Sequence, residues 1–155
     1  MIKRESYMAR IRPFIDGDLI KVLTGIRRSG KSVMLELIKD ELRARGVTEE
    51  QLIAFNFEDM RNAQLCTAEA LHDELVRRAA SIKGKIYFFF DEIQEVERWE
   101  RCVNSLRVEM DCDIYITGSN AKLLSGELAT YLAVLCGIYH LSIFLQRISG
   151  AVPFC

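Results

Sequence analysis

The residues with the clearest chemical pattern lie between a short apolar run and an amphipathic stretch near the amino end of the sequence. Residues 25–32 read Gly-Ile-Arg-Arg-Ser-Gly-Lys-Ser and fill every fixed position of the pattern G-x-x-x-x-G-K-[S/T]. A phosphate chain needs several converging backbone N–H donors, and glycine at Gly25 and Gly30 permits the turn that brings them together. The positive end of the following helix adds to the attraction. We therefore expect a phosphate-binding loop made of Gly25, Ile26, Arg27, Arg28, Ser29, Gly30, Lys31 and Ser32.

Four side chains of this loop carry expectations of their own. Lys31 is expected to reach the β- and γ-phosphates and to act in catalysis as a compact charge, and the Ser32 hydroxyl is expected to ligate Mg²⁺. Arg27 and Arg28 have two interpretations, either as contacts to phosphates or to a partner, or as solvated side chains on a loop. The expected chemistry of the loop thus depends on Lys31 and Ser32.

A second motif supplies two carboxylates. Residues 86–90 form an unbroken apolar run of the kind found in strands buried on both faces of a parallel sheet, and Asp91 and Glu92 follow it directly. Open α/β sheets bind ligands at the carboxyl ends of their strands. Asp91 is therefore expected to hold magnesium, directly or through water, and Glu92 to polarise the attacking water. An Asp-Glu pair alone is more often a solvated turn, so this interpretation depends on the phosphate loop.

Polar residues at the ends of two other expected strands stay open to two interpretations. Thr117, Ser119 and Asn120 stand where a γ-phosphate sensor would lie, but Ser and Asn are also ordinary turn residues. Glu58 and Asp59 follow another strand, either as a capped turn or as part of the site, and are left unassigned. The histidines and cysteines are interpreted as packing or surface residues.

The elements that must position these residues alternate along the chain. Strands are expected over residues 19–24, 52–57, 86–90 and 113–117, and amphipathic helical patterns lie between them. The apolar positions expected to face inward from the helices are Met34, Leu35, Ile38 and Leu42, then Leu71, Leu75, Ala79 and Ile82, then Trp99, Val103, Leu106 and Met110. This alternation predicts an α/β fold with a parallel sheet.

Composition excludes several classes of protein. The chain has 155 residues, half of them hydrophobic, which is enough for one domain with a core. Lys and Arg (21) nearly cancel Asp and Glu (22), so charge gives no indication of a nucleic-acid partner. Five cysteines without CxxC spacing suggest neither a disulfide framework nor a zinc site, and no secretory signal is seen, so a cytoplasmic location is expected.

These motifs together resemble a known family, the AAA-type ATPases of bacteria and archaea that carry an uncharacterised C-terminal domain. The resemblance covers the chain up to Leu132. It implies a P-loop NTPase three-layer sandwich of the AAA/ASCE type with a mainly parallel sheet, and ATP with Mg²⁺ as cofactors. By the same resemblance Ser32 and Asp91 bind the metal, Glu92 is catalytic, and Asn120 belongs to the nucleotide site. The blocks that carry it are Lys21 to Ser32, Phe55 to Asp59, Phe90 to Gln94 with Trp99, Ile116 to Asn120 and Leu123 to Thr130.

After Leu132 the family pattern stops. Synonymous codons for Ala133 to Cys155, when read one nucleotide later, can encode the family sequence that is missing after Leu132. We therefore expect an AAA-type domain over residues 1–132 and an out-of-frame apolar tail over 133–155. The last strand and the C-terminal domain of the family would then be missing or replaced, although Val134 to Leu145 is apolar enough to pair as a substitute strand. The uncharged stretch Leu128 to Leu145 is long enough to span a bilayer, but its polar residues and flanks argue against a membrane helix.

Three functions fit these observations. The first is an ATPase domain coupled to an unnamed partner, as a monomer or an oligomer. Its turnover is in question because AAA-type enzymes usually need arginines after the sensor strand or from a neighbouring subunit. The second is a nucleotide-dependent binding module without turnover. The third is an inactive truncated remnant whose apolar tail drives aggregation.

Overall fold

The architecture is a parallel sheet between two layers of helices. The computed structural model describes residues 8–9, 11–17, 20–24, 31–118, 138–142 and 152–153. Its sheet has the order β2-β3-β4-β1-β5-β6. The strands are β1 (Ile20–Thr24), β2 (Leu52–Asn56), β3 (Ile86–Asp91), β4 (Cys112–Gly118), β5 (Ile138–Ser142) and β6 (Val152–Pro153). Strands β1 to β5 pair in parallel, and β6 pairs antiparallel with β5. This arrangement confirms the predicted α/β P-loop NTPase-like sandwich.

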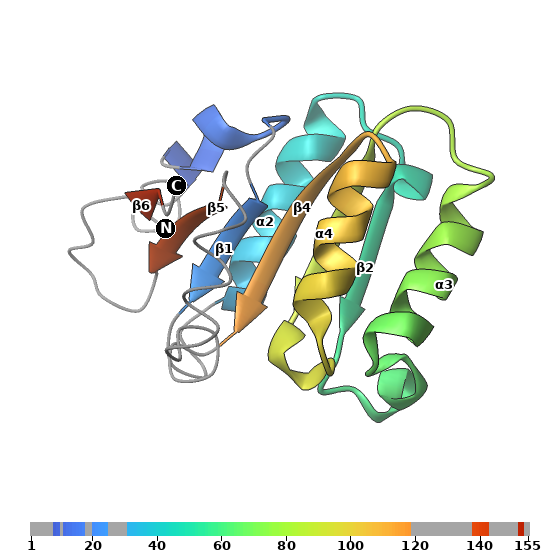
Figure 1. Ribbon diagram of the computed structural model, residues 1–155. Helices are drawn as coiled ribbons and strands as arrows, with labels where there is room; N and C mark the ends of the chain where they lie inside the picture. The colour runs from blue at the N-terminus through green and yellow to red at the C-terminus, as the bar shows by residue number, and fades with distance from the viewer. Residues whose placement is uncertain are drawn as a thin grey trace.

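Among the described residues, helices α2, α3 and α4 cover the two faces of this sheet (Figure 1). Helix α2 (Lys31–Ala44) packs on one face, and α3 (Ala68–Ala79) and α4 (Trp99–Glu109) pack on the other. Short 3₁₀ turns η1 (Arg12–Phe14), η2 (Glu49–Gln51), η3 (Met60–Leu65) and η4 (Ile93–Glu95) connect or precede these elements. Two separate hydrophobic clusters therefore fill the spaces on either side of the sheet.

Strand β3 shows how the sequence divides its side chains between the two clusters. Successive side chains of a strand point to opposite faces. Ile86, Phe88 and Phe90 accordingly join the cluster under α3 and α4, while Tyr87 and Phe89 join the cluster under α2. The same alternation places the side chain that follows Phe90 on the α2 face. A strand buried on both faces thus delivers its last residue, Asp91, toward the start of α2.

The helices follow the predicted apolar stripes. Met34, Leu35, Ile38 and Leu42 of α2 are buried, and Gly46 ends the turn after this helix with a φ of 97°. Helix α3 begins after Thr67, whose side chain accepts a hydrogen bond from the N–H of Ala70 at 3.2 Å. Leu71, Leu75, Trp99, Val103 and Leu106 are buried as expected, whereas Ala79, Ile82 and Met110 are only partly buried.

A buried polar network closes the amino ends of the strands. Lys21 of β1 forms an ion pair with Asp113 of β4, and both side chains are almost fully buried. Asp113 also accepts hydrogen bonds from the Tyr115 hydroxyl at 2.6 Å and from the N–H of Asp16 at 2.9 Å. Tyr87 in turn donates to the Asp16 carboxylate. Burial lowers the pKa of Lys21 despite its pairing with Asp113. This network fastens the segment before β1 to the sheet, at the edge opposite the predicted site.

The segment after Leu132 contributes a strand next to β1. Strand β5 lies beside β1 with Val22 opposite His140 in the register. Strand β5 lies within the stretch Val134 to Leu145, which was considered as a substitute strand at this position. Among the residues that the structure describes, no helix has the length and apolar character needed to cross a bilayer.

Candidate functional site

The carboxyl ends of three neighbouring strands and the first turn of α2 meet at one edge of the sheet. Strand β1 ends at Thr24, directly before the predicted phosphate loop, and α2 begins at Lys31. Strand β3 ends at Asp91, and β4, which lies between β1 and β3, ends at Gly118. Because all three strands are parallel, their ends share this edge. Lys31 and Ser32 therefore lie close in space to Asp91 and Glu92, which sequence reasoning selected from a separate segment.

Asp91 is the centre of the contacts at this edge. Its carboxylate accepts a hydrogen bond from the Ser32 hydroxyl at 2.5 Å and another from the Thr117 hydroxyl at 2.5 Å. Thr117 is fully buried and also accepts a hydrogen bond from the N–H of Glu92 at 3.0 Å. One threonine on β4 thus fixes the Asp91 side chain and the backbone of the next residue, and both of its hydrogen-bonding functions are used for this.

Glu92 lies in a constrained backbone position beside Lys31. Its φ of 57° and ψ of 52° are left-handed, a conformation that costs about 1–3 kcal/mol for a residue with a side chain. Its carboxylate lies 3.6 Å from the Lys31 ammonium, and both side chains are largely buried. The Gln94 amide donates to the other carboxylate oxygen at 2.7 Å. The turn after β3 therefore directs Glu92 back to the start of α2.

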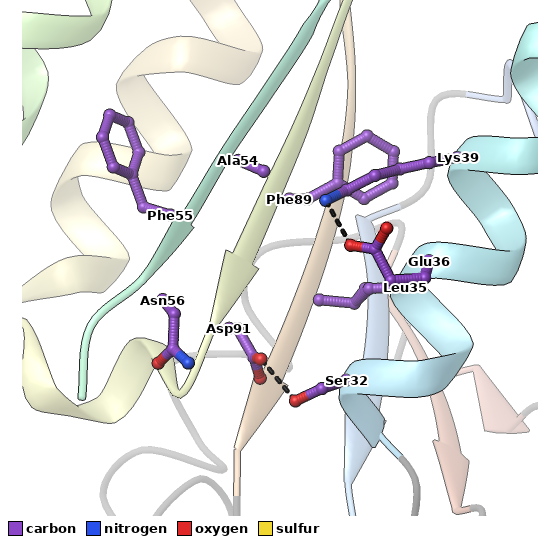
Figure 2. A pocket seen from close by; sticks show the side chains of 9 residues that line it. All are labelled: Ser32, Leu35, Glu36, Lys39, Ala54, Phe55, Asn56, Phe89 and Asp91. Atoms are coloured by element: carbon purple, nitrogen blue, oxygen red, sulfur yellow. Dashed lines mark hydrogen bonds and ion pairs between the residues drawn. The ribbon is translucent and has the colours of Figure 1, made fainter. Parts of the chain in front are cut away.

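A cavity of about 280 Å³ extends from Asp91 along the face of the sheet that α2 covers. Figure 2 shows Ser32 and Asp91 at one end of it and the Glu36–Lys39 ion pair at the other, where the ammonium lies over the Phe89 ring. The cavity lies between α2 and strands β2 and β3. The residues that line it are Ser32, Leu35, Glu36, Lys39, Ala54, Phe55, Asn56, Phe89 and Asp91.

The side chains at this edge fit a magnesium ion. Within the described part of the chain Asp91 forms no ion pair, although it is a buried carboxylate and such groups are usually compensated by a cation. Its neighbour Ser32 adds a hydroxyl oxygen, and Mg²⁺ prefers oxygen ligands. The described residues contain no group of three or more His, Cys, Asp or Glu side chains able to hold a metal. A few protein oxygens, supplemented by phosphate oxygens and water, are what Mg²⁺ uses in nucleotide sites.

Several predicted site residues are not covered by these contacts. Gly25 to Gly30, Ser119 and Asn120 lie outside the described residues, so their expected roles, including those of Ile26, Arg27, Arg28 and Ser29, stay predictions. The open question about Glu58 and Asp59 is settled for Asp59, which caps η3 by accepting from the N–H of Arg61 at 2.9 Å. Hydrogen bonds from Arg61 lower the pKa of Asp59 to about 2.

Sequence reasoning did not foresee what Thr117 and Gln94 contact. Thr117 was considered only as a sensor beside Ser119 and Asn120, but in the structure it binds Asp91 and Glu92. A signal was available, because strand alternation puts residue 117 on the same face as Tyr115, toward α2. Gln94 had no such signal, since its contact depends on the left-handed turn at Glu92.

Comparison with known proteins gives one family and two relatives. A family model described as an AAA domain matches residues 18–147. An uncharacterised protein of Haemophilus influenzae is 46% identical over 145 residues, which cover 92% of this chain and 36% of that protein. An uncharacterised protein of Methanocaldococcus jannaschii is 40% identical over 114 residues, which cover 73% of this chain and 24% of that protein. The chain thus spans well under half the length of either relative.

The family match continues to residue 147, past the point where the sequence pattern was expected to stop. It therefore includes β5, the strand that lies beside β1. The out-of-frame origin of residues 133–155 stays a prediction, and the nucleotide sequence of the gene is its test.

Proposed function

Because the chain belongs to the AAA domain family, whose members are nucleotide-binding domains, we propose that it binds ATP with Mg²⁺ and hydrolyses the bond that joins the γ-phosphate to ADP. The observation that carries the proposal is the contact set at the sheet edge. Of the last two residues of the G-x-x-x-x-G-K-S pattern, Ser32 bonds to Asp91 and Lys31 lies beside Glu92.

The proposed roles of the individual residues rest on the sequence motifs and on the described contacts. The backbone of Gly25 to Gly30 is proposed to hold the phosphate chain, with Lys31 at the β- and γ-phosphates. Ser32 and Asp91 are the residues that would hold Mg²⁺, which when bound neutralises charge on the phosphate oxygens. Glu92 accepts a proton from water as the water oxygen bonds to the γ-phosphorus, and the electron pair of the broken P–O bond stays on ADP. Thr117 keeps Asp91 and the Glu92 backbone in place.

A binding module without turnover is the second candidate, and one observation favours it. Both carboxylate oxygens of Glu92 already have partners, Lys31 on one side and Gln94 on the other. A general base needs one free carboxylate oxygen before it takes a proton from water. In an ATPase the incoming phosphates draw Lys31 away from Glu92 and free that oxygen for the attacking water.

Binding of Mg·ATP to the parent chain and to two lysine variants tests the site. Lys31→Ala removes a charged contact to phosphate worth about 1.5–3 kcal/mol, so affinity should fall by roughly 10- to 100-fold. Lys39→Ala is the matched control, because Lys39 lines the same cavity but pairs with Glu36. Its affinity should stay within about twofold of the parent. Equal affinity of the parent and Lys31→Ala would overturn the proposed site.

Phosphate release from the parent and from Glu92→Gln separates the two candidates. If the chain is an ATPase, the parent protein releases phosphate, and Glu92→Gln loses phosphate release while it still binds nucleotide. A binding module shows nucleotide binding in both proteins and release in neither. A partner protein and an oligomeric state are part of the same proposal, but no described contact identifies them.

A further inference from the structure

Gln94 makes a contact that the proposed mechanism does not yet use. Its side-chain nitrogen lies 2.7 Å from one oxygen of the Glu92 carboxylate, two residues earlier in the chain. The same nitrogen lies 3.5 Å from the Glu95 carboxylate. The other oxygen of Glu92 faces the Lys31 ammonium. Gln94 therefore holds the oxygen of Glu92 that is turned away from the expected phosphate position.

The turn that carries Gln94 is firmly anchored. Ile93 and Val96 on either side of it are fully buried in the core under α3 and α4. Farther along, the N–H of Glu97 donates to the carbonyl of Cys66, and the N–H of Ala68 donates to the carbonyl of Glu97, each at 2.9 Å. Because both ends of η4 are fixed in this way, the Gln94 amide starts from a defined position.

The orientation of the Gln94 amide is set by the charge of its partner. A carboxylate accepts hydrogen bonds, so the NH₂ group and not the carbonyl must face Glu92. The carbonyl oxygen of Gln94 is then left buried, and among the described residues it has no hydrogen-bond partner. An unpaired buried carbonyl is unfavourable, and such groups in native proteins call for an explanation other than stability. An apolar side chain of the same length would avoid this cost.

We propose that Gln94 is a positioning residue for ATP hydrolysis, which holds one oxygen of Glu92 so that the other is presented to the attacking water. The inference rests on the proposed function, because it requires Glu92 to be the base. When Lys31 binds the phosphates, Gln94 is the side chain among the described residues that continues to fix the carboxylate. The proton passes from water to the free oxygen of Glu92 while the water oxygen bonds to phosphorus and the bond to ADP breaks.

The test compares Gln94→Met with the parent in steady-state phosphate release, Mg·ADP binding and thermal unfolding. The variant loses one hydrogen bond to a charged group, so kcat should fall by about 10- to 100-fold. The affinity for Mg·ADP should stay within about twofold, and Tm within about 3 °C, since loss of the bond is offset by removal of the unpaired carbonyl. Gln64→Met, at an exposed position of η3, is the matched control and should keep the parent kcat.

A second variant and a double mutant exclude a merely structural role. Gln94→Glu keeps the length of the side chain but replaces the donor by a carboxylate, and should lose at least as much kcat. In the Glu92→Gln background, Gln94→Met should change the single-turnover rate by less than about twofold, because its effect passes through Glu92.

The inference is overturned if kcat is unchanged in both Gln94→Met and Gln94→Glu. It is also overturned if Gln94→Met lowers the single-turnover rate in the Glu92→Gln background by the full factor by which it lowers kcat in the parent. Parent turnover that Glu92→Gln abolishes would keep the proposed function even when Gln94 fails these tests. A parent chain without any phosphate release would overturn both.

Discussion

Replacing Thr117 with valine removes one hydroxyl from the centre of the site and leaves the shape of the side chain almost unchanged. That hydroxyl donates to Asp91 and accepts from the N–H of Glu92, and both bonds are buried. The lost bond to a carboxylate is worth about 1.5–3 kcal/mol, and the N–H left without an acceptor adds about 1–3 kcal/mol. Because the values are not additive, we expect a net loss of about 3 kcal/mol. For a chain of this size Tm then falls by roughly 6–12 °C.

Urea unfolding followed by circular dichroism measures this loss, and Thr117→Ser is the control. Serine keeps the hydroxyl and removes one methyl group, which costs about 1 kcal/mol at a buried position. Thr117→Val should therefore be the less stable variant, although valine is the more hydrophobic residue. The reasoning is refuted when Thr117→Val is as stable as the parent, or when Thr117→Ser is the more destabilised of the two.

Three further predictions concern the amino ends of the strands and the tail. Asp113→Ala leaves the buried charge of Lys21 without its partner, so the free energy of unfolding measured in urea should fall by about 3–5 kcal/mol. Burial and neighbouring carboxylates raise the pKa of Tyr115 and Tyr87 above the ordinary value near 10, so the folded state keeps phenolic protons that the unfolded chain loses. The free energy of unfolding should thus fall from about pH 10 upward, and it should fall less steeply in Tyr115→Phe. The lowered pKa of Lys21 acts in the opposite direction, because it makes stability rise with pH, but only up to the ordinary value of 10.5. Sequencing of the gene should find codons for 133–155 that open the family sequence in the next frame, and codons that do not would contradict the out-of-frame origin.

The order and type of the elements could be predicted because each carried a strong local pattern. The apolar run 86–90 is typical of a strand buried on both faces, and the stripe from Met34 to Leu42 fitted one face of a helix. Their common edge followed from the parallel sheet, so the approach of Ser32 to Asp91 was foreseeable. These inferences rested on periodicity, on the phosphate-loop pattern and on the rule that parallel strands end at the same edge.

The contacts that tie the site together were not predictable, because they depend on tertiary position. Lys21 in a strand pattern gives no indication that its charge is buried against Asp113, ninety-two positions away. Gln94 reaches Glu92 only because the backbone at Glu92 is left-handed, a conformation that glutamate rarely prefers. These contacts and this backbone conformation depend on the whole fold, and they cannot be derived from the conformational preferences of single residues.

Strand β4 is the last of strands β1 to β4 along the chain, yet it lies between β1 and β3 in the sheet. Lys31 and Asp91 therefore come together only after the chain from residue 20 to residue 118 has closed, and pairings so distant in sequence are slow to form. A nucleotide that needs both residues is expected to bind after the rate-limiting step of folding. The nucleotide should slow unfolding and leave the refolding rate unchanged. The proposed ATP ligand is thus expected to stabilise the sheet once it has formed, without assisting its formation.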